Sequence, residues 1–525
     1  MANNERKFLY IPSANIAVCA RLRGSVRAGD IRKGIDAAAR IHPLLAAKVV
    51  MGSPEEAFFA RGDPSAIPLR VCPRESDTQW FDEVVHEHTV PFDAFTCPLS
   101  RFILLTSGDV SDLVIFCQHA ISDGTALVLL LHDVLTHAYG SGGDLGEVVP
   151  PLITDCIPKA KESLVDRFTR GYSMGIINKR WRKDPWFFDH EDLISIHHAF
   201  WEKYAYRIVL FELAGDDAET LLAACRKQDV TIGSAVTMAF LAAWQDILVE
   251  RMYGGPGIPA GDTGSVEAGT GGRETRDGDG PGTGVKLPDY SGKAGEGVRE
   301  GDDSTPAGTH ADREDETGTS RKYTVVLPYD LRKRLDNPVG DVFCLFVGSI
   351  QVQAGYDRKR SFWENTRDFH DQTRQKIDSR EFFGPAAEIE RFDPTLMDAF
   401  MSYTLYAREV KKDDPRYAKL SAFAAARDNI AHILAERTLT LLPDIITTNL
   451  GRAGIPATFG DLQMEKLYFA PSASTTPLVL GGIGIGTGSS VTFTINILAE
   501  KGFEEERIRM MERVRDRAMR YLGCV

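Results

Sequence analysis

The sequence predicts an α/β or α+β fold built from two halves of similar size. Short runs of apolar and β-branched residues alternate along the chain with stretches whose apolar residues recur at helical spacing. The 525 residues are enough for two to four domains and a sizeable core. Residues 254–320 contain almost no large apolar side chains, and the alternating pattern continues on both sides of them. We therefore expect strands and helices that are interleaved throughout, interrupted by one insertion.

The first part of the chain begins with a strand expected over 16–22, followed by a helix over 30–41. Asp30 is the expected N-cap of that helix, because its side chain can accept from the first free backbone amides. Further elements follow the same alternation. Strands are expected over 44–51, 102–105 and 113–118, and helices over 126–139 and 232–249.

Beyond residue 320 the pattern resumes with a strand over 323–327, an apolar run over 340–346 and a charged helix over 361–377. The end of the chain, residues 445–497, is rich in β-branched residues and is followed by a charged helix. The uncharged run over 477–499 is long enough to span a membrane. Its central cluster of Gly, Thr and Ser instead predicts a strand, a turn and a second strand.

The insertion over 254–320 holds 14 acidic and 6 basic residues, so it carries about −8 of the formal net charge of −13. Such a segment cannot bury enough apolar surface to offset its loss of conformational entropy, and we expect it to be disordered. Its Asp-Gly repeats lack the spaced carboxylates of a calcium-binding loop.

Composition excludes several classes of protein. Hydrophobic residues make up 43% and charged residues 26%, as in an ordinary globular protein. The negative net charge disfavours nucleic acid as a partner. The eight cysteines are scattered without a Cys-x-x-Cys pair, so we expect reduced thiols, no metal site and no disulfide framework. We also expect no signal peptide, no transmembrane segment and a cytoplasmic location.

The stretch most informative about chemistry is Leu113-Val-Ile-Phe-Cys-Gln-His119-Ala-Ile-Ser-Asp123-Gly124. A buried strand delivers His119 to its end, and a short loop then turns into a helix. Imidazole is the side chain best suited to remove a proton near neutral pH, so His119 is placed like a general base. Asp123 is expected to hold the loop through an arginine or backbone amides, and Gly124 to permit a backbone geometry that side chains forbid. Taken alone, a histidine in this position is more often structural.

This HxxxDG pattern resembles the active-site motif of the superfamily of CoA-dependent and carrier-protein-dependent acyltransferases. That superfamily includes chloramphenicol acetyltransferase, condensation domains, and mycobacterial polyketide-associated acyltransferases of the phthiocerol dimycocerosyl transferase type. Other landmarks occur in the family's order along nearly the whole chain. They are Arg21-Leu-Arg23-Gly24, His42-Pro-Leu-Leu45, Val326-Leu-Pro-Tyr-Asp-Leu-Arg332 and Thr447-Thr448-Asn449-Leu-Gly-Arg452.

The resemblance implies two chloramphenicol-acetyltransferase-like subdomains, residues 1–185 and 186–525, with the insertion inside the second and a central tunnel between them. It implies that His119 deprotonates an alcohol acceptor, which attacks the thioester of acyl-CoA or of an acyl carrier protein without an acyl-enzyme. No cofactor is expected to be bound. Hydrogen-bond donors would stabilise the tetrahedral oxyanion, and an arginine from elsewhere would pair with Asp123. The candidate donors are Thr448, Asn449, Ser489 and Ser490, and the candidate arginines are Arg21 and Arg23.

Two departures from the family bear on the function. Condensation domains usually carry a doubled histidine, and Gln118 occupies the first of these positions here. No phosphopantetheine attachment motif or adenylation segment is present, which favours a stand-alone, EC 2.3.1-type transferase making an ester. The alternatives are a stand-alone, amide-forming condensation enzyme, and a catalytically silent protein that binds acyl groups or a carrier protein. Because a two-subdomain chain builds the tunnel internally, we expect a monomer.

Overall fold

The computed structural model describes most of the chain outside the insertion. The described residues are 1–140, 142–143, 146–157, 164–213, 215–253, 321–400, 410, 413–439, 442–474, 476–485 and 490–523. The predicted disordered insertion over 254–320 and the candidate donor Ser489 lie outside the described residues.

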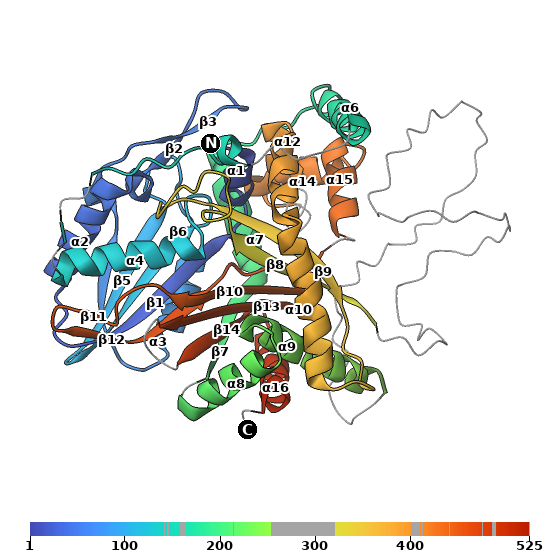
Figure 1. Ribbon diagram of the computed structural model, residues 1–525. Coiled ribbons are helices and arrows are strands. Elements are labelled where there is room, and N and C mark those ends of the chain that lie inside the picture. The colour runs from blue at the N-terminus through green and yellow to red at the C-terminus, as the bar shows by residue number, and fades with distance from the viewer. Residues whose placement is uncertain are drawn as a thin grey trace.

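Two six-stranded mixed sheets form the framework, with helices packed around them (Figure 1). The first sheet has the order β11-β12-β1-β6-β5-β4, and the second has the order β7-β14-β13-β10-β8-β9. The strands of the first sheet are β1 (Asn15–Arg23), β4 (Leu69–Pro73), β5 (Ser100–Ser107), β6 (Val110–Gln118), β11 (Thr458–Phe459) and β12 (Leu462–Ala470). Those of the second are β7 (Tyr204–Leu213), β8 (Tyr323–Asp330), β9 (Val347–Ala354), β10 (Ile445–Ala453), β13 (Leu478–Ile485) and β14 (Val491–Glu500).

The helices cover both sheets, and a small ribbon of β2 (Lys48–Met51) and β3 (Ala57–Ala60) lies beside the first. Figure 1 shows α2 and α4 side by side over the first sheet, and α9 and α16 together at the second. The helices of the first half are α1 (Asn3–Leu9), α2 (Ala28–Ile41), α3 (Gln79–Thr89), α4 (Gly124–Tyr139), α5 (Ile153–Cys156) and α6 (Leu164–Trp181). The remaining ones are α7 (His190–Lys203), α8 (Gly215–Lys227), α9 (Ile232–Tyr253), α10 (Phe362–Asp378), α11 (Gly384–Ile389), α12 (Pro394–Asp398), α14 (Ala418–Ala425), α15 (Ile430–Leu439) and α16 (Glu504–Leu522).

The strand that leads to the motif, β6, is the best protected of the first sheet. It pairs antiparallel with β1 on one side and β5 on the other, and every residue after Val110 is buried. A strand buried on both faces reads as a continuous apolar run, which is why 113–118 predicts this element correctly. His119 follows directly at the carboxyl end of this strand.

The boundary between the two halves is not a single point in the sequence. The predicted second subdomain, 186–525, includes β11 and β12, yet the structure pairs β12 with β1 of the first sheet, for example Cys19 with Tyr468. The first sheet is therefore completed by a strand from the far end of the chain. Separation of the halves at residue 185 would leave β1 paired with β6 alone and remove β12 from its other side.

The two sheets meet where β12 lies against β13 and β14. The Thr492 and Thr494 hydroxyls of β14 each donate at 2.6 Å to a backbone carbonyl of β12, those of Leu467 and Phe469. A Cβ atom on Gly481 of β13 would lie 2.4 Å from Pro471 Cδ. Glycine at this position lets the backbones approach closely, so the second sheet is held firmly against the first.

Two local predictions differ from the structure. The helix α2 begins at Ala28 with Arg27 as its N-cap, so Asp30 lies in the first turn and is not the cap. Only the end of 44–51 is a strand, because Pro43 opens a short 3-10 helix over Pro43–Ala46. The run 340–346, for which no element was predicted, is irregular, and its backbone groups bind the Arg332 and Asp123 side chains.

One helix among the described residues, α9, is long and apolar enough to cross a membrane by length and composition. Its window Ile232–Glu250 has a mean hydropathy of 1.5. However, 67% of that window is buried inside the fold, where α9 contacts α8, α10, α16 and β10. This burial is what the core helix of a globular domain requires. The run 477–499 forms β13 and β14, as predicted.

Candidate functional site

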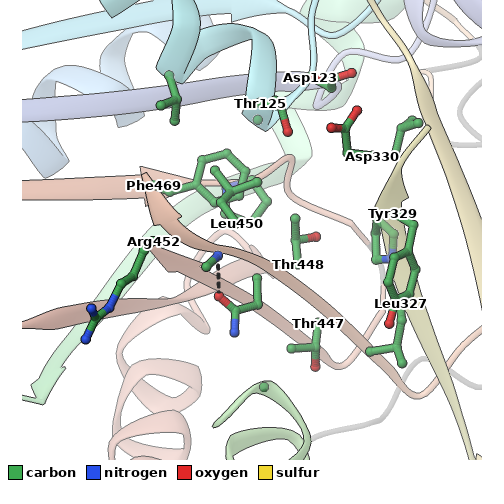
Figure 2. Close-up of a pocket in the computed structure, with 18 of the residues that line it drawn as sticks. Asp123, Thr125, Leu327, Tyr329, Asp330, Thr447, Thr448, Leu450, Arg452 and Phe469 are labelled. Carbon is green, nitrogen blue, oxygen red and sulfur yellow. Dashed lines mark hydrogen bonds between the residues drawn. The ribbon is translucent and has the colours of Figure 1, made fainter. Parts of the chain in front are cut away.

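A cavity of about 1100 Å³ lies between the two sheets, and both halves of the chain contribute to its wall. The first half supplies His119 and the start of α4, including Asp123, Gly124 and Thr125. The second half supplies β10 and the end of β8, together with the amino end of α9 and one side of α10. Figure 2 shows Asp123 and Thr125 on one side of this space, with Thr447, Thr448 and Leu327 across from them.

His119 follows the last residue of β6, and its backbone and ring are both fixed. Its backbone amide donates to the Ala14 carbonyl at 2.9 Å, and Nδ1 lies 2.6 Å from the Ser122 carbonyl oxygen. Because a carbonyl oxygen can only accept, Nδ1 carries the proton in this bond. The Nε2 atom of the neutral ring is therefore the one with a free lone pair.

The surroundings of His119 favour its neutral form. Burial lowers the pKa of the imidazole below its ordinary value, although the Ser122 carbonyl and the Asp123 carboxylate act in the opposite direction. The ring also stacks on Phe8 of α1, with a centroid distance of 4.3 Å and an interplanar angle of 15°. The histidine is consequently held in one tautomer and one orientation beside the cavity.

Asp123 forms no hydrogen bond or ion pair with His119; it organises the loop and the start of α4. Its Oδ1 accepts from the Ala126 amide at 2.9 Å and caps the helix, while Oδ2 accepts from the Phe346 amide at 2.7 Å. The Arg332 guanidinium donates to both oxygens, at 3.1 and 2.9 Å. Both side chains are buried, so the motif is tied to the end of β8 through a charged pair.

The prediction that Arg21 or Arg23 pairs with Asp123 is wrong. Arg21 lies directly opposite Asp112 in the register of β1 and β6, and its Nε donates to that carboxylate at 2.8 Å. Arg23 is exposed and pairs with Glu465. Both arginines are satisfied by the nearest carboxylate across a strand pair. The partner of Asp123 is Arg332, the last residue of the segment 326–332 that resembles a motif of the acyltransferase superfamily. The position of this arginine at the end of that motif is the sequence feature that could have identified it.

Gly124 is required for packing and not for an unusual backbone conformation. The residue is not among those with a positive φ, which corrects the predicted reason for a glycine. A Cβ atom here would lie 2.6 Å from Leu450 Cδ2 and 3.1 Å from Phe469 Cζ. The missing side chain lets β10 and β12 approach the first turn of α4 at the cavity wall (Figure 2).

The candidate oxyanion donors fall into two groups. Thr448 and Asn449 line the cavity, and Asn449 Oδ1 accepts from the Gly451 amide at 2.9 Å, the bond drawn in Figure 2. Ser490 is not part of the cavity wall; its hydroxyl donates to Glu212 at 2.9 Å, so this candidate does not fit. The neighbouring Thr447, which was not among the predicted donors, lines the cavity with a buried hydroxyl that has no hydrogen-bond partner among the described residues.

Gln118 occupies the place of the first histidine in condensation domains, and both ends of its amide are engaged. Its Nε2 donates to the Phe8 carbonyl at 2.5 Å, and its Oε1 accepts from the Ala120 amide. Gln118 therefore joins α1 to the loop that carries His119. This side chain has a structural role that the sequence did not reveal.

Charged side chains lie at the rim of the cavity. Lys333, Arg374 and Arg452 line it and are exposed, and none of the three has an ion-pair partner among the described residues. Asp330, by contrast, is paired with Arg332 at 2.9 Å. The described residues contain no group of three or more His, Cys, Asp or Glu side chains that could hold a metal ion. Asp341 also lines the cavity and is exposed, so the rim carries more cationic than anionic side chains in a chain whose net charge is −13.

Comparison with known proteins identifies the fold. No protein-family model matches the chain, and no curated protein matches it in sequence. Solved structures align over nearly its whole length at low identity. Polyketide synthase associated protein 5 from Mycobacterium tuberculosis matches with TM-score 0.50 and 13% identity, covering 99% of this chain and 97% of that one. TRI3 trichothecene 15-O-acetyltransferase from Fusarium sporotrichioides matches with TM-score 0.57 and 11% identity, covering 98% and 94%.

The first condensation domain of the CDA synthetase also matches, with TM-score 0.50 and 11% identity, covering 100% of this chain and 95% of that domain. At such identities the likeness concerns the fold, and the site must be judged by its own geometry. The chain has the two-subdomain, chloramphenicol-acetyltransferase-like fold that is shared by condensation domains and acyltransferases.

Proposed function

We propose that this protein is an acyltransferase that moves an acyl group from an acyl-CoA or carrier-protein thioester to an alcohol hydroxyl. The observation that carries the proposal is the state of His119. Its Nδ1 proton is bound to the Ser122 carbonyl, and burial keeps the ring neutral beside a cavity that two subdomains enclose. A neutral imidazole with a free Nε2 lone pair is the group that general-base catalysis needs.

In the proposed reaction, the acceptor hydroxyl gives its proton to His119 Nε2 while its oxygen attacks the carbonyl carbon of the thioester. The resulting tetrahedral oxyanion collapses, the carbon–sulfur bond breaks, and the imidazolium returns the proton to the leaving thiolate. The products are an ester and a free thiol, and no acyl-enzyme forms. Thr448 and Asn449 are the cavity residues we propose as oxyanion donors.

The cationic rim supports a phosphate-bearing thioester as the donor. CoA and phosphopantetheine both carry phosphate, which unpaired lysine and arginine side chains bind well. Lys333, Arg374 and Arg452 provide three such groups at the edge of the cavity. We further propose that the chain acts as a monomer, because it supplies both walls of the cavity itself. The free cysteines of the described residues support our proposal that it acts in the reducing cytoplasm.

The experiment that tests the function is thiol release from a panel of acyl-CoAs, acetyl to long chain, with and without alcohol and amine acceptors. Wild-type protein is assayed beside His119→Ala. Acceptor-dependent release that disappears in the variant is the expected result, and a preference for amines would favour the amide-forming alternative. Equal release by both proteins would remove His119 from the mechanism. No release from any acyl-CoA would point either to a carrier-protein thioester as the donor or to the silent binding protein, and an assay with an acylated carrier protein would distinguish the two.

A further inference from the structure

The first turns of α4 and α9 meet β10 at neighbouring residues. A Cβ atom on Gly124 of α4 would lie 2.6 Å from Leu450 Cδ2. A Cβ atom on Gly233 of α9 would lie 3.0 Å from Asn449 Nδ2. Both turns line the cavity, together with His119. The part of β10 at Asn449 and Leu450 therefore borders the amino ends of two helices.

A serine and a histidine meet at the first turn of α9. Ser234 is the third residue of the helix, and its Oγ lies 3.0 Å from Nδ1 of His370 on α10. Figure 1 shows α10 passing beside α9, which brings the two side chains together. Both residues line the cavity; Ser234 is 5% exposed and His370 is half-buried. No carboxylate pairs with His370 in the described part of the chain, so the two residues form a dyad.

The hydrogen bonds around Ser234 favour its activation as a nucleophile. A hydroxyl that donates to a neutral imidazole nitrogen can pass its proton to that nitrogen when the oxygen attacks a carbonyl carbon. The Thr231 hydroxyl, 2.9 Å from Ser234 Oγ, can donate to this oxygen at the same time. Thr231 Oγ1 also accepts from the Ser234 backbone amide at 3.1 Å, which fixes the turn. The positive amino end of the 22-residue helix α9 further stabilises negative charge on Oγ.

Hydrogen-bond donors for a developing oxyanion lie beside this turn. The Thr447 side chain is 5% exposed and lines the cavity, and its hydroxyl has no hydrogen-bond partner among the described residues. A buried hydroxyl that stays unpaired costs free energy, which a ligand oxygen would recover. Asn449 Nδ2 lies close to Gly233 on the same strand as Thr447. The amides of Ile232 and Gly233 have no acceptor within the helix, because they open it.

We propose that Ser234 and His370 form a second catalytic dyad, which hydrolyses acyl thioesters through an acyl-serine. Ser234 Oγ attacks the thioester carbonyl carbon while His370 Nδ1 takes the hydroxyl proton. The carbon–sulfur bond then breaks, and the imidazolium gives that proton to the leaving thiolate. Thr447 and Asn449 would hold the oxyanion.

Water completes the proposed reaction. It attacks the ester carbon of acyl-Ser234 and gives one proton to His370. That proton passes to Ser234 Oγ as the carbon–oxygen bond to the serine breaks, so the products are a carboxylic acid and the original dyad. This hydrolysis goes beyond the proposed transfer at His119, and its acyl-serine is not an intermediate of that transfer.

The first test labels the nucleophile directly, so it does not depend on the identity of the acyl group. Diisopropyl fluorophosphate forms a bond from phosphorus to an activated serine oxygen, with loss of fluoride. We expect wild-type protein to carry the label on Ser234, located by mass spectrometry of its peptides. Wild-type protein without the label on Ser234 would overturn the proposal, whatever the folding of any variant.

The role of His370 is measured by the rate of the same labelling. His370→Gln should slow it at least 100-fold, because general-base catalysis contributes about 10²–10⁴-fold. His132→Gln is the matched control, since His132 also lines the cavity but pairs with Asp133. This variant should be labelled at the wild-type rate. Equal rates in the wild type and both variants would contradict the assignment of His370 as the base.

The second test measures hydrolysis with the acyl-CoA panel of the transfer assay, without any acceptor. We expect thiol release that persists in His119→Ala and disappears in Ser234→Ala. Acid quenching should trap the acyl group on wild-type protein and not on Ser234→Ala. Ser173→Ala, which replaces a buried serine of α6 outside the cavity, should hydrolyse like the wild type. Release that depends on His119 and not on Ser234 would mean direct attack by water and would contradict the proposal.

Hydrolysis at Ser234 and transfer at His119 can fail independently. If acceptor-dependent release is absent while Ser234 is labelled and acylated, the proposed function fails and the hydrolytic dyad stands. If transfer occurs but Ser234 is neither labelled nor acylated, the dyad is rejected and the proposed function stands.

Discussion

The Arg332 guanidinium donates to both carboxylate oxygens of Asp123, although the two residues are 209 positions apart in the sequence. The same guanidinium donates to the Val342 and Cys344 carbonyls at 3.0 and 2.5 Å. The backbone of the irregular run 340–346 is thus folded around the arginine, and Phe346 completes the arrangement by donating to Asp123. One ion pair connects the end of β8, this run and the first turn of α4.

Removal of either partner of this ion pair should destabilise the fold strongly. Arg332→Met leaves a buried carboxylate without a counter-charge, which costs about 3–5 kcal/mol. Asp123→Asn leaves the buried arginine with Asp330, whose side chain is 29% exposed, as its remaining carboxylate partner among the described residues, and it also weakens the cap of α4. The double variant should lose less than the sum of the two, because the charge that then lacks its partner, Asp330, is 29% exposed and not fully buried. Urea denaturation of the four proteins measures the coupling.

Arg23→Met is the matched control for that experiment. Arg23 also ends a strand and also pairs with a carboxylate, but its side chain is 54% exposed. An exposed ion pair contributes at most about 1 kcal/mol, so this variant should unfold close to the wild-type midpoint. Additive losses in the Arg332 and Asp123 variants would mean that the pair contributes no coupling energy.

Gly124→Ala should strain the cavity wall. The added methyl group would meet Leu450 Cδ2 at 2.6 Å, and such overpacking typically costs about 1–3 kcal/mol. Combining it with Leu450→Ala should relieve the contact, so that Gly124→Ala costs less in that background. Thermal or urea unfolding measures both effects. Gly175→Ala in α6 is the control, since nothing lies within 4 Å of its Cβ position. Alanine in a helix interior should increase the free energy of unfolding by about 0.5–1 kcal/mol there. A similar increase in stability on replacement of each glycine by alanine would contradict the packing argument.

The sequence predicts the parts of the site that depend on local pattern. His119, Asp123 and Gly124 follow one another through a strand, a loop and a helix, and the apolar run before them is buried as expected. The partner of Asp123 was not predicted, because Arg21 is nearer in sequence to the motif but lies opposite Asp112 in the sheet. Pairing of β6 with β1 decides this, and that register depends on the whole fold.

The helix α1 shows a second limit. Its residues have no helical pattern strong enough to predict it, and its stability comes from Glu390 and Asp398, almost four hundred positions away. Phe8, Lys7 and the role of Gln118 became visible only when this segment was placed against His119. Long-range contacts of this kind leave no local signal in a single sequence.

The pH dependence of acyl transfer should report the burial of His119. A general base acts only when unprotonated, so kcat/KM should be level near neutral pH and fall as the pH drops through the pKa of the imidazole. Because burial lowers that pKa, the acidic limb should have its midpoint below the ordinary value of about 6.5. The midpoint therefore shifts to lower pH, since a lowered pKa of the base extends the active range towards acid. Steady-state rates with a neutral alcohol acceptor, measured from pH 4.5 to 8, give the midpoint.

Two variants test which group titrates in this acidic limb. Lys7→Met should move the midpoint to higher pH, because the Lys7 ammonium contributes to the lowered pKa of His119. His132→Ala, which changes another cavity histidine, should leave the midpoint unchanged. A midpoint at or above 6.5 in the wild-type protein, or one that follows His132, would show that the titrating base is not the buried His119.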